Sequence, residues 1–186
     1  GEGDARVRDA RRVPDAAHRH DFHPAVHHDA ENCEEHSACA RQCVAAAQAR
    51  ALSAGHGELD PLHLLGALLD DDSGTASGLV ERAGRKPGTL SDIVQAELSR
   101  RPTVAGTNTA PATAPALMHV LNDAQQHAAR MGDAYTSIEH LLLALATIDS
   151  PAKAAMATSG LSAKAIAAAV SDLREASGVE HIDDPE

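Results

Sequence analysis

The sequence predicts an all-α fold of two pseudo-twofold repeats, each of about four helices, with no β-sheet. Three observations carry this prediction. Hydrophobic residues make up 43% of the chain but aromatic residues only 1%, so small aliphatic side chains must fill the core. Segments of strong helix formers recur along the chain. Residues 54–69 also match residues 131–146 when the sequence is shifted by 77 positions, which indicates an internal repeat.

Residues 1–37 are expected to form a flexible N-terminal arm, because they mix Arg, Asp and His with two prolines and show no helical periodicity. The first helix is predicted from about Cys39 to Ala54. This segment, CARQCVAAAQARALSA, consists almost entirely of helix-forming residues, and Gly55 follows it where glycine often ends a helix. The folded domain is therefore expected to begin near residue 38.

A second helix is predicted after Asp60, which can act as the N-cap residue and precedes a proline at the first helical position. Three leucines of this helix, Leu62, Leu65 and Leu69, form one apolar stripe. An amphipathic helix of this kind needs other helices to cover its apolar side.

The same pattern recurs in the second copy, where either Thr136 or Ser137 can cap the helix. Thr136 would form a capping box with Glu139. His63 and His140 fall at equivalent places in the two copies. Because both positions would descend from one ancestral unit, their similarity favours a structural role over a paired metal or proton site.

The repeat sets the predicted organisation of a domain that covers residues 38–176. Repeat 1 covers residues 38–102 and repeat 2 covers residues 117–176. The segment 103–116 between them is rich in Thr, Ala and Pro and has no apolar stripe, so it is predicted to be a linker. Residues 177–186 form an acidic tail. One copy alone would bury little apolar surface, so the two copies should pack around a common core.

The formal charge of −11 disfavours binding to nucleic acids and to anionic membrane surfaces, because both are negatively charged. No apolar run approaches the roughly 18 to 20 residues of a membrane span. The N-terminus also lacks the apolar region of a secretory signal. We therefore expect a cytoplasmic protein without nucleic-acid or membrane partners.

Several motifs occur in a fixed order along the two copies. The first copy contains G-H-x3-D-P-L-H-L-L from Gly55, followed by R-x-P-x-V-x-G from Arg100. The second contains V-L-N from Val120 and G-D-x-Y-x-S-x-E-H-L-x-L-A-L from Gly132. Together these motifs resemble the N-terminal (Clp N) domain of the Hsp100/Clp ATPases, and they are more similar to the ClpB disaggregase type than to the ClpC type.

This resemblance implies a non-catalytic recognition module. Such a domain docks unfolded or aggregated polypeptide, or an adaptor protein, for a ring of Clp ATPase modules supplied in cis or in trans. The chain contains no G-x-x-x-x-G-K-[ST] motif to hold nucleotide phosphates, so no enzymatic activity is expected of it.

The resemblance also implies a peptide-binding groove. Leu121 would line its apolar floor, Asp133 and Glu139 would place carboxylates on its rim, and Cys39 would lie alongside. An apolar groove with an acidic rim suits segments rich in Leu, Val, Lys and Arg. The alternative is structural: Glu139 would serve in the capping box, and Asp133 would lie in a solvated turn.

A separate hypothesis comes from a cluster of imidazole and thiol groups, which are preferred ligands of Zn²⁺ and Cu⁺. The candidate ligands are His18, His20, His23, His27, His28, Cys33, His36, Cys39 and Cys43. At 100° per residue, the last four would share one helix face. The rival function is therefore metal binding or metal sensing by the arm. The alternative is a histidine-rich arm without a metal, in which Cys39 and Cys43 are small core residues.

Overall fold

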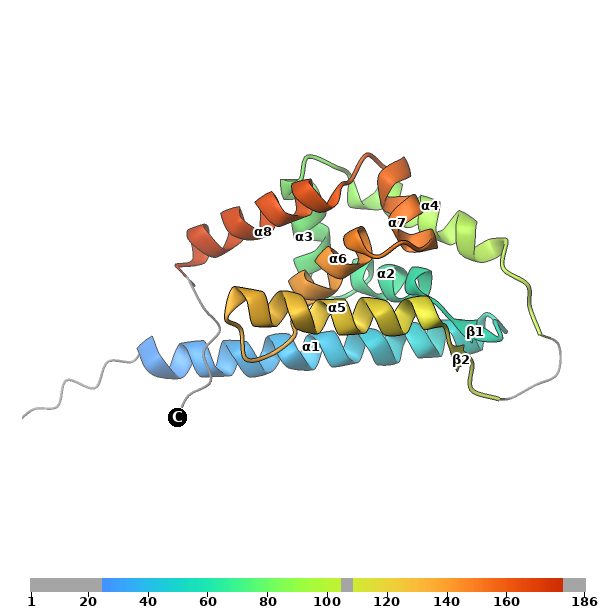
Figure 1. Cartoon of the computed structure of the whole chain (residues 1–186), viewed down its shortest axis with the longest axis horizontal. Coiled ribbons are helices and arrows are strands. Elements are labelled where there is room, and N and C mark those ends of the chain that lie inside the picture. The colour runs from blue at the N-terminus through green and yellow to red at the C-terminus, as the bar shows by residue number, and fades with distance from the viewer. Residues whose placement is uncertain (1–24, 105–108, 179–186) are drawn as a thin grey trace, which may run out of the picture.

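A computed structural model of the chain describes residues 25–104 and 109–178, with side chains from Ala38 onward. These residues form eight helices and one short strand pair, which confirms the predicted all-α fold (Figure 1). Repeat 1 contains α1 (Ala25–Ser53), β1 (Glu58–Leu59), α2 (Pro61–Leu69), α3 (Thr75–Arg82) and α4 (Pro87–Ser99). After β2 (Ala112–Thr113), repeat 2 contains α5 (Pro115–Met131), α6 (Ile138–Thr147), α7 (Pro151–Thr158) and α8 (Ala163–Ser177).

The two repeats build one core with matching positions. Every residue of α2 is buried, as is every helical residue from Ile138 to Ala146 in α6, so these two helices form the centre of the domain. The inner faces of α1 and α5 are related by the same 77-residue shift. Their buried residues are Ala40, Cys43, Ala47 and Ala51 on α1, and Leu117, Val120, Ala124 and Ala128 on α5.

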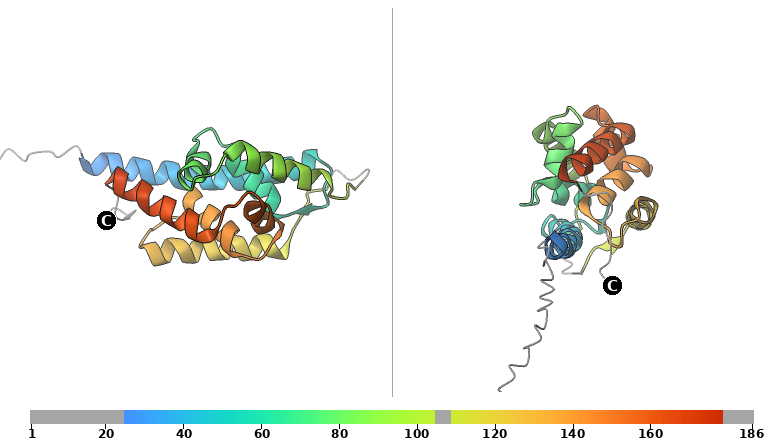
Figure 2. Two further views of the ribbon diagram at one scale, coloured as in Figure 1. Left: turned by 90° about the horizontal axis from the view of Figure 1, so that it is seen from above. Right: turned by 90° about the vertical axis from the view of Figure 1, so that its left-hand side faces the viewer.

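The remaining helices cover the central pair from two sides. Helices α1 and α5 run antiparallel along one side of the molecule, while α3, α4, α7 and α8 lie on the other (Figures 1 and 2). The repeats interlock on that second side, where α3 packs on α8 and α4 packs on α7. No helix in the described part of the chain is both long enough and apolar enough to cross a membrane.

Helix α1 begins at Ala25, well before the start that we predicted near Cys39. It therefore extends into the segment that we expected to be a flexible arm. The physical reason is composition: no Gly or Pro interrupts the sequence between Ala25 and Ser53, and its acidic stretch is rich in Ala and Glu, which favour helix. Residues 1–24 lie outside the described part.

The described part of the predicted linker contains a short strand, so the expectation of no β-sheet needs a small correction. Strand β1 pairs in parallel with β2, through only two residues on each side. Before β1, the Val104 N–H donates to the Gly55 carbonyl at 2.8 Å. The Ala112 N–H donates to the Gly57 carbonyl at 3.0 Å. The pairing arises because the extended backbone between α1 and α2 needs hydrogen-bond partners.

The helix caps agree with the prediction in both repeats, but one predicted capping box does not form. Asp60 caps α2 as expected, accepting from the Leu62 N–H at 2.7 Å. In repeat 2 the N-cap is Ser137, so the capping box predicted between Thr136 and Glu139 is wrong. The residue that completes both capping boxes is the histidine at the third helical position.

Candidate functional site

The four predicted groove residues do not share one surface. Leu121 on α5 and Cys39 on α1 are half-buried and pack against the edge of the core. Asp133 follows α5, and Glu139 lies in the first turn of α6. The side chain of Asp133 is 0% exposed and that of Glu139 is 11% exposed. The two carboxylates therefore do not form the solvent-facing rim that we expected.

Both carboxylates are held by Arg174 in the last turn of α8. The Arg174 guanidinium donates to Glu139 at 2.7 and 3.2 Å and to Asp133 at 3.2 Å, with a further short contact to Asp133. Burial works to lower the pKa of Arg174, but hydrogen bonds and charge from Asp133 and Glu139 outweigh it and raise that pKa. The arginine thus remains charged and compensates two buried carboxylates.

His140 is the fourth member of this cluster. Its Nδ1 atom accepts the Ser137 backbone N–H at 2.9 Å, so we assign the ring proton to Nε2, which lies 2.8 Å from Asp133. Burial lowers the pKa of His140, against the opposing effect of Glu139 and Asp133. A second proton on Nδ1 would face the backbone N–H. His140 is therefore a neutral connector between the start of α6 and Asp133.

The order Ser137, His140, Asp133 resembles a hydrolase triad, since the Ser137 hydroxyl lies 2.9 Å from the His140 Nδ1 atom. The environment does not suit catalysis. All three residues are buried, and the Nδ1 lone pair already accepts a backbone N–H. A substrate therefore cannot reach the hydroxyl, and the base is committed to capping a helix.

The same cluster brings three metal-binding groups together. Ligand atoms of Asp133, Glu139 and His140 all lie within 4.8 Å of one another. The guanidinium of Arg174 lies against all three groups, at hydrogen-bond distance from each. It supplies the positive charge that a divalent ion would bring, so a metal would have to displace it.

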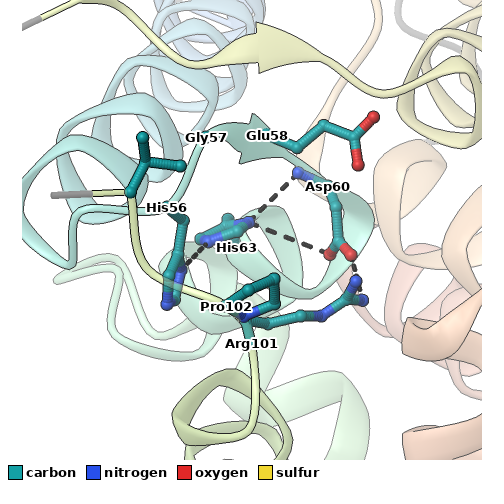
Figure 3. A pocket seen from close by; sticks show the side chains of 8 residues that line it. His56, Gly57, Glu58, Asp60, His63, Arg101 and Pro102 are labelled. Atoms are coloured by element: carbon teal, nitrogen blue, oxygen red, sulfur yellow. Dashed lines mark hydrogen bonds and ion pairs between the residues drawn. The ribbon is translucent and has the colours of Figure 1, made fainter. Parts of the chain in front are cut away.

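The first repeat contains the equivalent arrangement with different partners (Figure 3). The His63 Nδ1 atom accepts the Asp60 N–H at 3.1 Å, and its Nε2 lies 2.8 Å from the His56 Nδ1 atom. Arg101 forms an ion pair with Asp60. Burial lowers the pKa of His63, with Asp60 opposing this effect. These side chains, with Val104, line an open pocket of about 140 Å³.

The predicted metal ligands fall into two groups. His18, His20 and His23 lie outside the described residues. The backbone of α1 carries His27, His28, Cys33, His36, Cys39 and Cys43 on one continuous helix. Ten residues of helix separate Cys33 from Cys43, which is about 15 Å, so those two cannot bind the same ion.

Cys43 is a core residue. It is buried, and burial raises the pKa of its thiol to about 12, with further contributions from Asp71 and Cys39. Metals bind the thiolate, so this environment opposes ligation by Cys43. Its surroundings agree with the structural alternative for this residue.

Sequence reasoning missed Arg174, Arg101 and His56, although the repeat held a signal for the first. In the C-terminal half of each repeat the shift is 76 residues, which relates Leu98 to Arg174. The 77-residue shift relates Leu62 to Glu139. Two positions that are leucine in repeat 1 are thus occupied by Glu139 and Arg174 in repeat 2. A joint change of this kind indicates an ion pair.

The side of the molecule formed by α1 and α5 leaves apolar side chains accessible. Met118 on α5 is 56% exposed, and Leu121, three residues later, shares its face. The shift relates Leu121 to Val44 on α1, which is half-buried as well. The side formed by α1 and α5 therefore presents solvent-accessible apolar side chains beside the core.

Comparison with known proteins identifies relatives of this chain. The profile of a family described as the Clp repeat (R) N-terminal domain matches residues 35–159. The chain is similar to the chaperone protein ClpB of Mesorhizobium japonicum, with 36% identity over 77% of this chain and 17% of that protein. It is also similar to ClpB of Brucella suis, with 34% identity over 77% of this chain and 17% of that protein. The chain thus spans about a sixth of these relatives.

Solved structures give the same result. The N-terminal domain of Hsp104 from Candida albicans aligns with a TM-score of 0.67 and 25% identity, over 76% of this chain and 91% of that one. The N-terminal domain of the ClpV1 ATPase from E. coli aligns with a TM-score of 0.61 and 20% identity, over 82% and 93%. The second comparison concerns the fold alone.

Proposed function

Since this chain belongs to the Clp repeat N-terminal domain family, we propose that it docks unfolded polypeptide, or an adaptor that carries it, for a Clp ATPase ring. Domains of this family are non-catalytic parts of Clp ATPases. The ring would be supplied by modules in cis or in trans. The ClpB relatives are much longer than this chain, so the activity of those whole proteins is extended to this chain only as part of this proposal.

The observation that carries the proposal is the accessible apolar surface of α5, where Met118 and Leu121 lie on one face. Exposed methionine suits a surface that must accept varied sequences, because its side chain is flexible and polarisable. Cys39 and Val44 extend the apolar character to α1, which runs along the same side (Figure 1).

Asp133 and Glu139 act behind this surface in our proposal. Their bonds to Arg174 fix the corner between α5 and α6 against α8, and so hold α5 in place. Selection for basic peptides would then come from other carboxylates. The affinity should be modest, because the module must release its cargo: micromolar binding corresponds to about −8 kcal/mol.

The test is fluorescence anisotropy with a labelled, unfolded peptide rich in Leu, Val, Lys and Arg. Leu121→Ser should weaken binding about tenfold at any salt concentration, because it removes apolar burial. The matched control is Leu173→Ser, which changes a half-buried leucine of α8 on the other side. Circular dichroism must show both variants folded. Equal binding by wild type and Leu121→Ser, or equal losses in both variants, would contradict the proposal.

A further inference from the structure

Two equivalent turns lie side by side across the boundary between the repeats. Gly84 lies just after α3 with φ of +77°, and Gly160 lies just after α7 with φ of +78°. A Cβ atom added at Gly160 would lie 2.9 Å from the Cζ atom of Arg85, so the two turns touch. Figures 1 and 2 show both turns at the side of the molecule opposite α1 and α5.

These turns carry a group of exposed cations, which we call the basic surface: Arg82, Arg85, Lys86 and Lys164. Arg82 ends α3, Arg85 and Lys86 form the turn into α4, and Lys164 lies in the first turn of α8. Glu81 is the acidic residue that adjoins this group in sequence. The basic surface therefore keeps a net positive charge on a chain whose formal charge is −11.

The cations of this surface have no counter-ions within the described part of the chain. Elsewhere each arginine at positions 50, 100, 101, 130 and 174 forms an ion pair with a carboxylate. The cations without such a pair among the described side chains are Arg41, Arg82, Arg85, Lys86, Lys153 and Lys164. Four of these six are in the basic surface.

The helix ends beneath this surface add to its positive potential. Helices α4 and α8 both begin here, and neither has an acidic residue in its first turn. The N-cap of α4 is Lys86, whose side chain provides no hydrogen bond to the helix. Helix N-termini carry partial positive charge, so the two add to the field of the four side chains.

We propose that the basic surface docks an acidic segment of a partner protein. Arginine and lysine on two rigid turns can pair with carboxylates spaced along a peptide, and arginine can do so with two hydrogen bonds. Charge complementarity selects a short acidic segment over a nucleic acid, because a long polyanion would also meet the negative remainder of the chain. The surface lies opposite α1 and α5, so an acidic partner and an apolar polypeptide could bind together.

The probe is a short labelled peptide in which Glu alternates with Ser, titrated with the full chain at low salt. Reversing two charges, Arg85→Glu with Lys86→Glu, should weaken binding about tenfold, and added salt should weaken wild-type binding likewise. The matched control is Arg41→Glu, an exposed and unpaired cation on α1. It should leave the affinity within about twofold. Binding of the apolar peptide should be unchanged by the double reversal, which separates this proposal from the one above.

Four results would overturn the proposal. The first is the absence of wild-type binding at low salt, and the second is an equal loss in Arg41→Glu. The third is binding of a single-stranded oligonucleotide that is tighter than binding of the peptide and that the same double reversal abolishes. The acidic tail could also fill the surface in cis. If Asp183→Asn with Asp184→Asn raises peptide affinity severalfold, the occupant is the tail rather than a partner.

Discussion

His63 and His140 occupy equivalent positions in the two repeats, and each accepts the backbone N–H of its N-cap residue through Nδ1, at 3.1 and 2.9 Å. In both repeats Nε2 then faces a residue seven positions earlier, which is His56 in repeat 1 and Asp133 in repeat 2. The two histidines thus tie the start of each central helix to the turn that precedes it, as neutral rings.

Stability should fall when the pH drops below the ordinary histidine pKa of 6.5. Burial lowers the pKa of both His63 and His140 in the folded chain, so below 6.5 the unfolded chain binds protons that the folded chain does not. The full stability is present above that pH and is lost as the pH falls toward the folded pKa values. Each unit of depression contributes about 1.4 kcal/mol. Urea denaturation across this range measures it.

Two variants make that measurement specific. His140→Gln should flatten the dependence on pH, because it removes one of the two groups. His119→Gln, at an exposed position on α5, should leave the slope as in wild type. The explanation is wrong if His140→Gln keeps the full slope.

Arg174→Leu should destabilise the domain by about 3–5 kcal/mol, because it leaves Asp133 and Glu139 buried without their cation. Adding Glu139→Leu should recover at least half of the loss, since it recreates the leucine pair that repeat 1 has at Leu62 and Leu98. A double-mutant cycle by urea denaturation measures this coupling. Arg130→Leu, which breaks an exposed pair with Asp123, should change stability by less than about 1 kcal/mol. Additive losses at Glu139 and Arg174 would refute the coupling.

Gly84→Ala and Gly160→Ala should have similar costs, because both glycines have positive φ and share a conformational strain of about 1 kcal/mol. Open space surrounds Gly84, and the new Cβ at Gly160 would meet only the guanidinium end of the exposed Arg85 side chain, which can move aside. Thermal melts of the two variants test this. A clearly larger cost at Gly160 that Arg85→Ala removes would contradict the expectation and show that Arg85 is held rigidly against the turn.

Zn²⁺ or Cu⁺ bound by the histidines and cysteines of the N-terminal segment should not support the helical core. Cys43, whose pKa is raised to about 12, should not be a ligand. Thermal melts with and without EDTA should then coincide, and Cys43→Ala should bind as much Zn²⁺ as wild type. A large loss of helicity on chelation would make the metal structural.

The internal repeat made most of the fold predictable. The 77-residue shift located both central helices, their histidines and the glycine turns, because these depend on local sequence and on periodic burial. The start of α1 was missed because Ala25–Ser37 has helix-forming residues but no apolar periodicity. Arg174 was missed because its contact with Glu139 spans 35 residues, and pattern reasoning alone treats each helix separately.

The expected acidic rim failed for a related reason. From sequence, a carboxylate at a turn or at the start of a helix is expected to be solvated. Its burial becomes predictable only when a cation far away in the sequence is known to pair with it. For Asp133 and Glu139 that cation comes from the last helix of the domain.

The backbone between α1 and α2 holds both Val104 and Ala112, because the Gly55 carbonyl accepts from the Val104 N–H and the Gly57 carbonyl accepts from the Ala112 N–H. These two bonds depend on the residues at the ends and not on the number of residues between them. A fluorescent tag or an affinity peptide inserted between Val104 and Thr109 should therefore leave both repeats folded, as thermal melts would show. The domain thus offers an internal position for a reporter.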